Sequence, residues 1–113
     1  MKKTITLKKN YEFKKVLTKG KYFSGRYLDI YVLKNHSCNN YIGIAIGVKV
    51  AKAVKRNRIK RLIRENYRLI EERLKTGYTI ILLWKRKIDI KNATYENINK
   101  DIIQVFKKIG ILE

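Results

Sequence analysis

The feature that most constrains the fold is a pair of short apolar runs on either side of one long amphipathic segment. The runs read YIGIAIGV at residues 41–48 and YTIILLW at residues 78–84, and this content predicts two buried strands. Residues 51–75 repeat apolar side chains with the helical period, which predicts one long helix. This order favours parallel strands joined by a crossover. Gly43 and Gly47 indicate a bulge or a close backbone approach in the strand predicted at residues 41–48.

Two further helices are expected near the ends of the chain. Residues 11–19 are predicted to form a helix that Asn10 caps and Gly20 ends. Thr94 is predicted to cap a last helix that runs to Gly110. The apolar side chains of that last helix are Tyr95, Ile98, Ile102, Val105, Phe106 and Ile109.

A third strand is expected at residues 26–33, where apolar and polar residues alternate. The alternation places Leu28, Ile30 and Val32 on one face and Tyr27, Asp29 and Tyr31 on the other. The elements then follow in the order α-β-β-α-β-α, which predicts an α+β sandwich with a small mixed sheet packed against helices. With 113 residues and no linker, residues 1–113 are expected to form one domain.

The long helix also carries the chain's most unusual charge pattern. Between Lys49 and Arg64, eight of sixteen residues are Lys or Arg and none is an acid. At 100° per residue, Ile59, Leu62, Ile63, Ile70 and Leu74 form an apolar stripe, whereas Asn57, Lys60, Arg61, Arg64 and Arg68 lie on the opposite side. Asn66 falls within the stripe, where it needs a hydrogen-bond partner. This pattern predicts an anchored helix that presents a ridge for phosphate groups.

The total charge indicates a polyanionic partner. The chain has 28 Lys and Arg against nine Asp and Glu, a net charge of +19, which disfavours a compact state unless a polyanion is bound. Nucleic acid is favoured over a membrane surface, because the charges are spread through a folded pattern and not confined to one amphipathic helix. No run is long enough to cross a bilayer, and the N-terminus does not resemble a signal peptide.

Residues for protein-based catalysis or metal binding are not evident. The acids do not form a pair suited to acid–base chemistry, and we expect no catalytic residue. His36 and Cys38 lie in a polar segment without other ligands, so we expect no metal site and an exposed loop there. A single cysteine excludes an intrachain disulfide and fits the cytoplasm.

A second surface is suggested by aromatic side chains. Tyr27 and Tyr31 share the polar face of the strand predicted at residues 26–33, and Phe13 and Tyr11 belong to the helix that precedes it. Aromatic side chains beside Lys and Arg side chains can hold single-stranded nucleic acid, because nucleobases stack on the aromatic rings. For Phe13, a place in the core is an equally good interpretation.

Several of these motifs together resemble the bacterial ribonuclease P protein family. AVKRNRIKRLIRE, residues 53–65, is similar to the family's RNR signature, and GYTIILLWK resembles the strand that follows it. Phe13, Val16 and Gly20 resemble the family's first helix, and Arg26 and Tyr31 its first strand.

The resemblance implies a small basic protein that binds a catalytic RNA and the 5′ leader of precursor tRNA. It implies a left-handed crossover around the RNR helix, chemistry carried by the RNA with Mg²⁺ bound mainly by the RNA, and no obligate protein partner. The implied contacts to the RNA subunit are Lys49, Lys52, Arg56, Asn57, Arg58, Lys60, Arg61, Arg64 and Arg68, and the implied leader contacts are Phe13, Leu17, Tyr27 and Tyr31.

The chain departs from the family pattern at the entrance to the RNR helix. Gly47, Val48 and Lys49 stand where Ser-Lys-Lys is common, so one base is missing, and Ala51 stands where Gly is common. Leu17 replaces a frequent aromatic residue of the first helix. A general RNA-binding protein and a DNA-binding helix protein are the alternatives; the DNA-binding alternative is disfavoured because we find neither a helix-turn-helix pair nor a dimerisation heptad.

Overall fold

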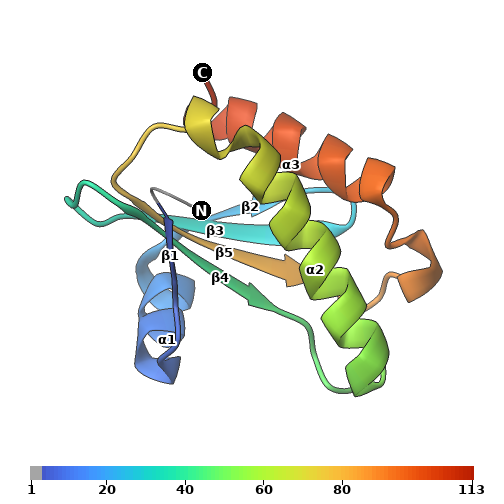
Figure 1. Ribbon diagram of the computed structural model, residues 1–113. Helices are drawn as coiled ribbons and strands as arrows, with labels where there is room; N and C mark the ends of the chain where they lie inside the picture. The colour runs from blue at the N-terminus through green and yellow to red at the C-terminus, as the bar shows by residue number, and fades with distance from the viewer. Residues whose placement is uncertain (1–3) are drawn as a thin grey trace.

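A five-stranded mixed sheet carries helices on both of its faces (Figure 1). The computed structural model describes residues 4–113. The strands are β1 (Thr4–Thr6), β2 (Lys21–Ser24), β3 (Leu28–Lys34), β4 (Asn40–Ala45) and β5 (Tyr78–Trp84), in the sheet order β1-β4-β5-β3-β2. Strand β4 pairs in parallel with β1 and β5, whereas β3 pairs antiparallel with β5 and β2.

The helices divide between the two faces of the sheet. Helices α2 (Ala53–Ile70) and α3 (Tyr95–Ile109) cover one face, and α1 (Asn10–Lys19) lies on the other (Figure 1). In Figure 1, β4 and β5 both point to the right, and α2 passes in front of the sheet on its way from β4 up to β5. This crossover is left-handed, although nearly all such connections in proteins are right-handed. The resemblance had implied this handedness.

The main core lies between the sheet and the helices α2 and α3. Leu28 and Ile30 from β3 are fully buried there, as the alternation had predicted. Strand β5 is central, and it buries Ile80 and Leu82 on this side and Ile81 on the α1 side. A strand with both faces covered must be apolar nearly throughout, which explains the YTIILLW run.

Helix α2 is anchored deeply in this core. The ring of Tyr67 packs edge-on against that of Phe106 in α3, with centroids 6.4 Å apart. The Tyr67 hydroxyl forms a 2.7 Å hydrogen bond with the hydroxyl of Thr4 in β1. Burial is the main reason why the pKa of Tyr67 lies above its ordinary value. Asn66 donates from its amide nitrogen to the carbonyl of Leu62 at 3.0 Å, so half of the predicted need for partners is met, whereas its buried Oδ1 has no hydrogen-bond partner among the described residues.

Two strands were not predicted from the sequence. Strands β1 and β2 have three and four residues, and both lie at edges of the sheet. Their residues are largely exposed and polar, so periodicity gives little signal, and only pairing with β4 and β3 makes them strands. The sheet therefore has two more strands than the predicted order α-β-β-α-β-α.

Some predicted boundaries and caps were also wrong. Asn10 does not cap the first helix: it is the first helical residue, the N-cap is Lys9, and no side chain caps the end. The long helix ends at Ile70 and continues as a 3-10 turn (Glu71–Arg73), short of the predicted residue 75. Thr94, by contrast, caps α3 as predicted, since its hydroxyl accepts from the N–H of Asn97 at 3.2 Å.

The buried carboxylate of Asp101 in α3 fixes the turn between β2 and β3. It accepts backbone N–H groups from Arg26, Tyr27 and Leu28 at 3.0, 2.7 and 2.8 Å. A side chain on Gly25 would collide with this carboxylate, because an added Cβ would lie 2.6 Å from its Oδ2. One side chain thus satisfies three consecutive backbone donors and ties α3 to the sheet.

Replacing Asp101 should therefore destabilise the protein strongly. We expect Asp101→Ala to lower the free energy of unfolding by about 3 kcal/mol or more, because three backbone donors lose a charged acceptor. Urea denaturation at neutral pH measures the change. Glu96→Ala on the exposed side of the same helix is the control and should cost less than about 1 kcal/mol. Equal losses for the two variants would contradict this role for Asp101.

Candidate nucleic-acid interface

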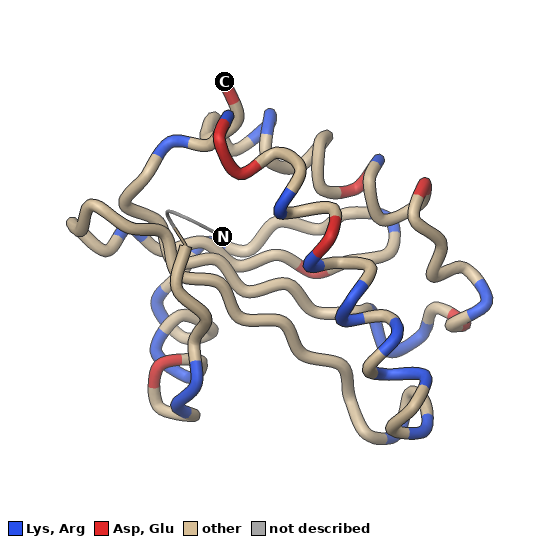
Figure 2. The backbone as a smooth tube through the Cα atoms, viewed as in Figure 1, with Lys and Arg blue, Asp and Glu red and all other residues tan. Residues whose placement is uncertain are grey.

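The predicted basic ridge lies on the solvent side of α2. Figure 2 shows Lys and Arg concentrated along the first part of this helix and in the turn before it. Of the nine side chains expected to bind RNA, Lys49, Lys52, Asn57, Arg58, Arg61, Arg64 and Arg68 are exposed, and Arg56 and Lys60 are half-buried. Within residues 4–113, none of the eight Lys and Arg side chains in this set forms an ion pair. Their charges are thus available to a partner.

The apolar stripe behind the ridge holds these charges in place. Ile59, Ile63 and Ile70 are buried on the core side of α2. Leu62 was predicted in the same stripe and is half-buried against the main core. Because this face packs along its length, the exposed bases keep a fixed spacing and do not move as they would on a flexible tail.

Arg56 has a structural contact as well as a charge. Its guanidinium Nη1 donates to the carbonyl of Ala51 at 2.7 Å, and its backbone N–H donates to the carbonyl of Lys52 at 2.9 Å. Both bonds close the turn that leads into α2. Lys52 is the N-cap, and no side chain caps this end and no acid lies in its first turn. The positive end of the helix dipole is therefore not neutralised by an acid, and it adds to the positive charge of the nearby Lys and Arg side chains.

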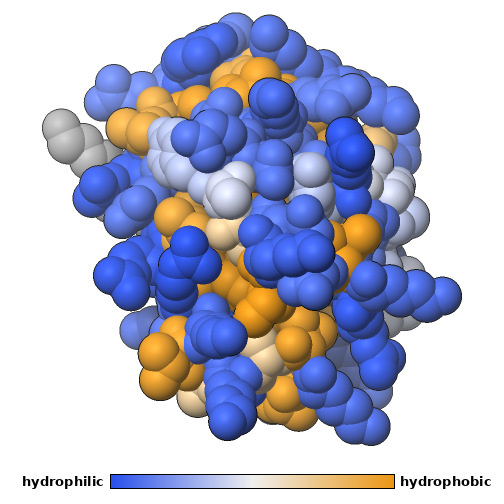
Figure 3. Space-filling model, turned by 90° about the vertical axis from the view of Figure 1, so that its right-hand side faces the viewer, coloured by the Kyte–Doolittle hydropathy of each residue, from blue (hydrophilic) through white to orange (hydrophobic). Residues whose placement is uncertain are grey.

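The loop after β5 extends the ridge with bases that sequence reasoning did not assign. Lys91 lies beside Lys55 and Arg58, where the three line a hollow of about 280 Å³ together with Asp89. The carboxylate of Asp89 is used within the loop, since it accepts the N–H of Lys91 at 2.9 Å. Figure 3 looks onto this side of the molecule and shows hydrophilic side chains projecting over it, with hydrophobic surface between them. The charge of the loop was visible in the sequence, but its nearness to α2 was not.

The opposite face of the sheet carries the aromatic side chains near α1. Phe13 packs its ring directly over Gly43 of β4, where an added Cβ would lie 2.6 Å from the ring. This is the close approach expected for that glycine; Gly47 has no such contact, since an added Cβ would meet only Val50 at 3.5 Å. Tyr31 belongs to the same apolar cluster as Phe13, and Leu17 is exposed on α1.

Tyr22 joins this surface, although no pattern in the sequence predicted it. Its ring lies 5.1 Å from that of Tyr31 between centroids, across the β2–β3 pair. It was missed because β2 was not predicted, and without that strand nothing placed Tyr22 opposite Tyr31. Its ring is half exposed and offers a flat surface to solvent.

Tyr27 does not lie with these aromatic residues, so its predicted face was wrong. It precedes β3, and its N–H is held by Asp101 instead of a neighbouring strand. Its ring stacks on Trp84 at 6.0 Å and packs against the main core on the α2 and α3 side. The strict alternation of a strand does not extend to Tyr27, which reverses the side to which it points.

A polar network borders the Tyr22–Tyr31 pair. The Nζ atom of Lys85 forms a 2.7 Å ion pair with Asp29 Oδ1, and the Tyr22 hydroxyl donates to the same oxygen at 2.6 Å. Burial lowers the pKa of Lys85, but the hydrogen bond and charge of Asp29 outweigh it, so the pKa lies above its ordinary value. Asp29 is thus neutralised and repels a nearby phosphate less than a free carboxylate would.

A row of exposed cations fixed on one helix of a small α+β domain is the feature expected of a polyanion-binding protein. The family described as ribonuclease P matches residues 1–110 of this chain. A ribonuclease P protein component from Clostridioides difficile is 44% identical over 110 residues, which is 96% of this chain and 95% of that protein.

Solved structures agree with this match. The ribonuclease P protein of Staphylococcus aureus has a TM-score of 0.78 at 26% identity, covering 96% of this chain and 97% of that one. The protein from Thermotoga maritima has a TM-score of 0.81 at 22% identity, covering 91% and 96%, which shows the shared fold. The chain belongs to the ribonuclease P protein family and is a subunit of ribonuclease P, an endoribonuclease of tRNA processing.

If the α2 ridge contacts phosphates, removing its exposed arginines should change how binding depends on salt. We expect Arg61→Ala and Arg64→Ala each to weaken RNA binding and to reduce the slope of log K against log salt concentration by about one. Filter binding across a salt series measures the slope. Lys108→Ala in the last turn of α3 is the control and should leave it unchanged. An unchanged slope in both arginine variants would remove them from the interface.

Proposed function

We propose that this subunit binds the catalytic RNA of ribonuclease P through the α2 ridge and the 5′ leader of precursor tRNA through the α1 face of the sheet. In this role it assists the endonucleolytic removal of the leader, which gives the mature tRNA 5′ end. The observation that carries the proposal is the row of Lys and Arg side chains on the solvent side of the anchored helix α2, none of which forms an ion pair within residues 4–113. Rigid, regularly spaced cations suit the backbone of a folded RNA, which presents phosphates at fixed positions.

The leader surface is proposed from Phe13, Leu17 and Tyr31, extended by Tyr22. An exposed aromatic pair beside a cation is a platform on which unpaired bases can stack, and stacking does not require one sequence. Tyr27 is left out because its ring packs on Trp84 at the other side of the sheet.

The two surfaces meet at one end of the molecule. Tyr31 pairs with Ile81 in the middle of β5, and the Asp29–Lys85 ion pair beside it lies at the carboxyl-terminal end of that strand. Helix α2 begins shortly after β4 ends, so the ridge starts close to the open part of the α1 face (Figure 1). An RNA held on α2 and a single strand on the sheet would therefore be neighbours, as cleavage between leader and tRNA requires.

The chemistry of cleavage is assigned to the RNA partner. Among the described residues, no three or more His, Cys, Asp or Glu side chains gather into a metal-binding group. A strongly positive surface also disfavours Mg²⁺, which supports binding of the catalytic Mg²⁺ mainly by RNA. The proposed role needs no other protein partner and places the protein in the cytoplasm. No described helix is long and apolar enough to span a membrane.

Reconstitution with a cognate catalytic RNA tests this function. We expect the protein to raise the rate of precursor-tRNA cleavage at low Mg²⁺ by at least about tenfold, equivalent to about 1.4 kcal/mol of transition-state stabilisation. The reason is that its cations replace part of the screening that Mg²⁺ provides. A protein that binds unrelated RNAs equally well and leaves the rate unchanged would instead be a general RNA-binding protein.

The leader surface makes a separate prediction. Tyr31→Leu keeps an apolar side chain in the cluster but removes the aromatic face, so precursor tRNA should bind more weakly to the holoenzyme by about 1–3 kcal/mol. Mature tRNA, which lacks the leader, is the control and should bind almost as before. Titration of both tRNAs with labelled 5′ ends gives the two affinities. An equal loss for both would place Tyr31 outside the leader site.

A further inference from the structure

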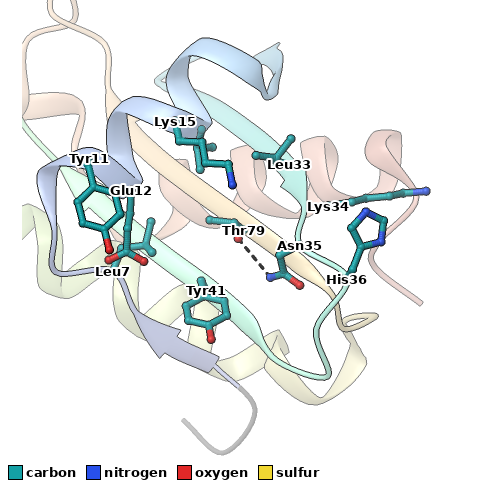
Figure 4. A pocket seen from close by; sticks show the side chains of 11 residues that line it. Leu7, Tyr11, Glu12, Lys15, Leu33, Lys34, Asn35, His36, Tyr41 and Thr79 are labelled. Atoms are coloured by element: carbon teal, nitrogen blue, oxygen red, sulfur yellow. Dashed lines mark hydrogen bonds between the residues drawn. The ribbon is translucent and has the colours of Figure 1, made fainter.

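Helix α1 divides its face of the sheet into two halves. Phe13 sits over Gly43, near the middle of β4. Tyr31 and Gly43 pair with the same residue of β5, Ile81, so Tyr31 lies level with Phe13 along the strands, where the half toward the start of α2 begins. On the other side of α1, the half formed by Tyr41, Thr79 and Leu33 contains a separate hollow of about 330 Å³ (Figure 4). This volume falls at the lower end of the range for small-molecule sites.

The hollow is preformed by the turn after β3. The Asn35 amide donates to Thr79 Oγ1 and to the carbonyl of Asn39, both at 3.2 Å. Its oxygen accepts the N–H of Ser37 at 2.8 Å. These bonds hold His36 in the left-handed region, with φ at 56°, an uncommon conformation for a residue other than glycine. The imidazole is therefore carried at the rim of the hollow by a fixed backbone.

Charges of opposite sign lie at the two ends of the hollow. Lys34 and His36 stand at one end, and Lys15 points its ammonium group toward the middle from α1 (Figure 4). Glu12 lies at the other end, beside Tyr11. The ring of Tyr41 stands between the two ends. A ligand that fits must carry an anion at one end, a flat group in the middle and a hydrogen-bond donor at the far end.

We propose that this hollow binds a nucleoside 5′-phosphate whose base carries an exocyclic amino group, either free or as one residue of single-stranded RNA. The phosphate lies between Lys15 and His36, where charge-assisted hydrogen bonds are available, and Lys34, whose side chain extends outward past His36, adds positive charge at the rim (Figure 4). The base packs against Tyr41, and its amino group donates to Glu12. The basic side chains at the rim disfavour a metal cation, and the charges at both ends of the hollow disfavour a purely apolar ligand.

The site is distinct from the surfaces assigned above. Leu17 and Glu12 lie on opposite flanks of α1, because five positions along a helix rotate a side chain by about 140°. The leader surface lies toward Leu17, and the hollow lies toward Glu12. Nucleotide binding there holds whether or not the leader follows the proposed path.

Titration of the full-length protein with adenosine 5′-monophosphate, followed by amide chemical shifts, tests the site. We expect saturable shifts at Lys34, His36 and Thr79. Adenosine without the phosphate and uridine 5′-monophosphate without the amino group should each bind at least about fivefold more weakly. Shifts confined to the Tyr22–Tyr31 half, or shifts that do not saturate, would overturn the proposal.

Two neighbouring lysines separate a specific site from general attraction to a basic protein. Lys15→Gln and Lys14→Gln remove the same charge from α1, but Lys14 lies outside the hollow. We expect Lys15→Gln to weaken adenosine 5′-monophosphate binding at least about fivefold and Lys14→Gln to change it less than twofold. Equal effects would sink the proposal.

A second pair of variants protects the test against misfolding. His36→Gly suits the positive φ, so it should weaken nucleotide binding while leaving the melting temperature equal or higher. Lys108→Gln in the last turn of α3 is the control and should leave both nucleotide affinity and the melting temperature unchanged. A His36→Gly protein that binds as tightly as the original would remove the imidazole from the site.

Competition identifies which source of nucleotide the site takes. A pentaadenylate RNA that displaces adenosine 5′-monophosphate, and loses affinity with Lys15→Gln, would show that a strand residue enters the hollow. A strand that binds without displacing the mononucleotide would restrict the hollow to free nucleotides. Either result supports the site, whereas displacement that is unaffected by Lys15→Gln contradicts it.

Discussion

The packing of the apolar stripe of α2 against the sheet and α3 is the contact on which the other features depend. Ile59, Ile63 and Tyr67 are fully buried in it. It closes the left-handed crossover between β4 and β5 and offsets the self-repulsion of a chain with a net charge of +19. Because the apolar side of the helix is packed firmly, the other side can carry Lys and Arg side chains that no acid neutralises and still keep them at fixed positions. Fold stability and the proposed RNA contact thus use two faces of the same element.

Helix α1 has a comparable double role on the opposite face. Its Phe13 ring needs the bare backbone of Gly43 to come close to the sheet. By crossing the strands there, α1 leaves two open areas of different chemistry. One has the Tyr22–Tyr31 pair and a neutralised Asp29, and the other has a hollow with bases at one end and an acid at the other. A sheet face that one short helix only partly covers can therefore offer more than one place to a nucleotide.

The sequence predicted an element correctly where the spacing of its apolar or capping residues is typical of a single kind of secondary structure. The stripe of α2, the buried β5 strand and the Thr94 cap followed from local spacing, and each was confirmed. Strands β1 and β2 could not be predicted, because short polar edge strands take their conformation from the neighbour with which they pair. The same limit hid Tyr22. Tyr27 was assigned to the wrong face because Asp101, 74 residues away, turns its backbone out of the strand pattern.

The sequence by itself determined the fold class, the amphipathic helix and the row of bases on its outer side, since these depend on residues three or four positions apart. It also determined, through the RNR motif and its neighbours, the family to which the chain belongs. Only the tertiary structure decided which side chains from distant segments meet. The Lys91 loop beside α2, the aromatic pair across β2 and β3, and the hollow beside α1 all join residues that no local period connects. Those contacts arise from sheet pairing and from helices crossing strands, which a linear pattern does not encode.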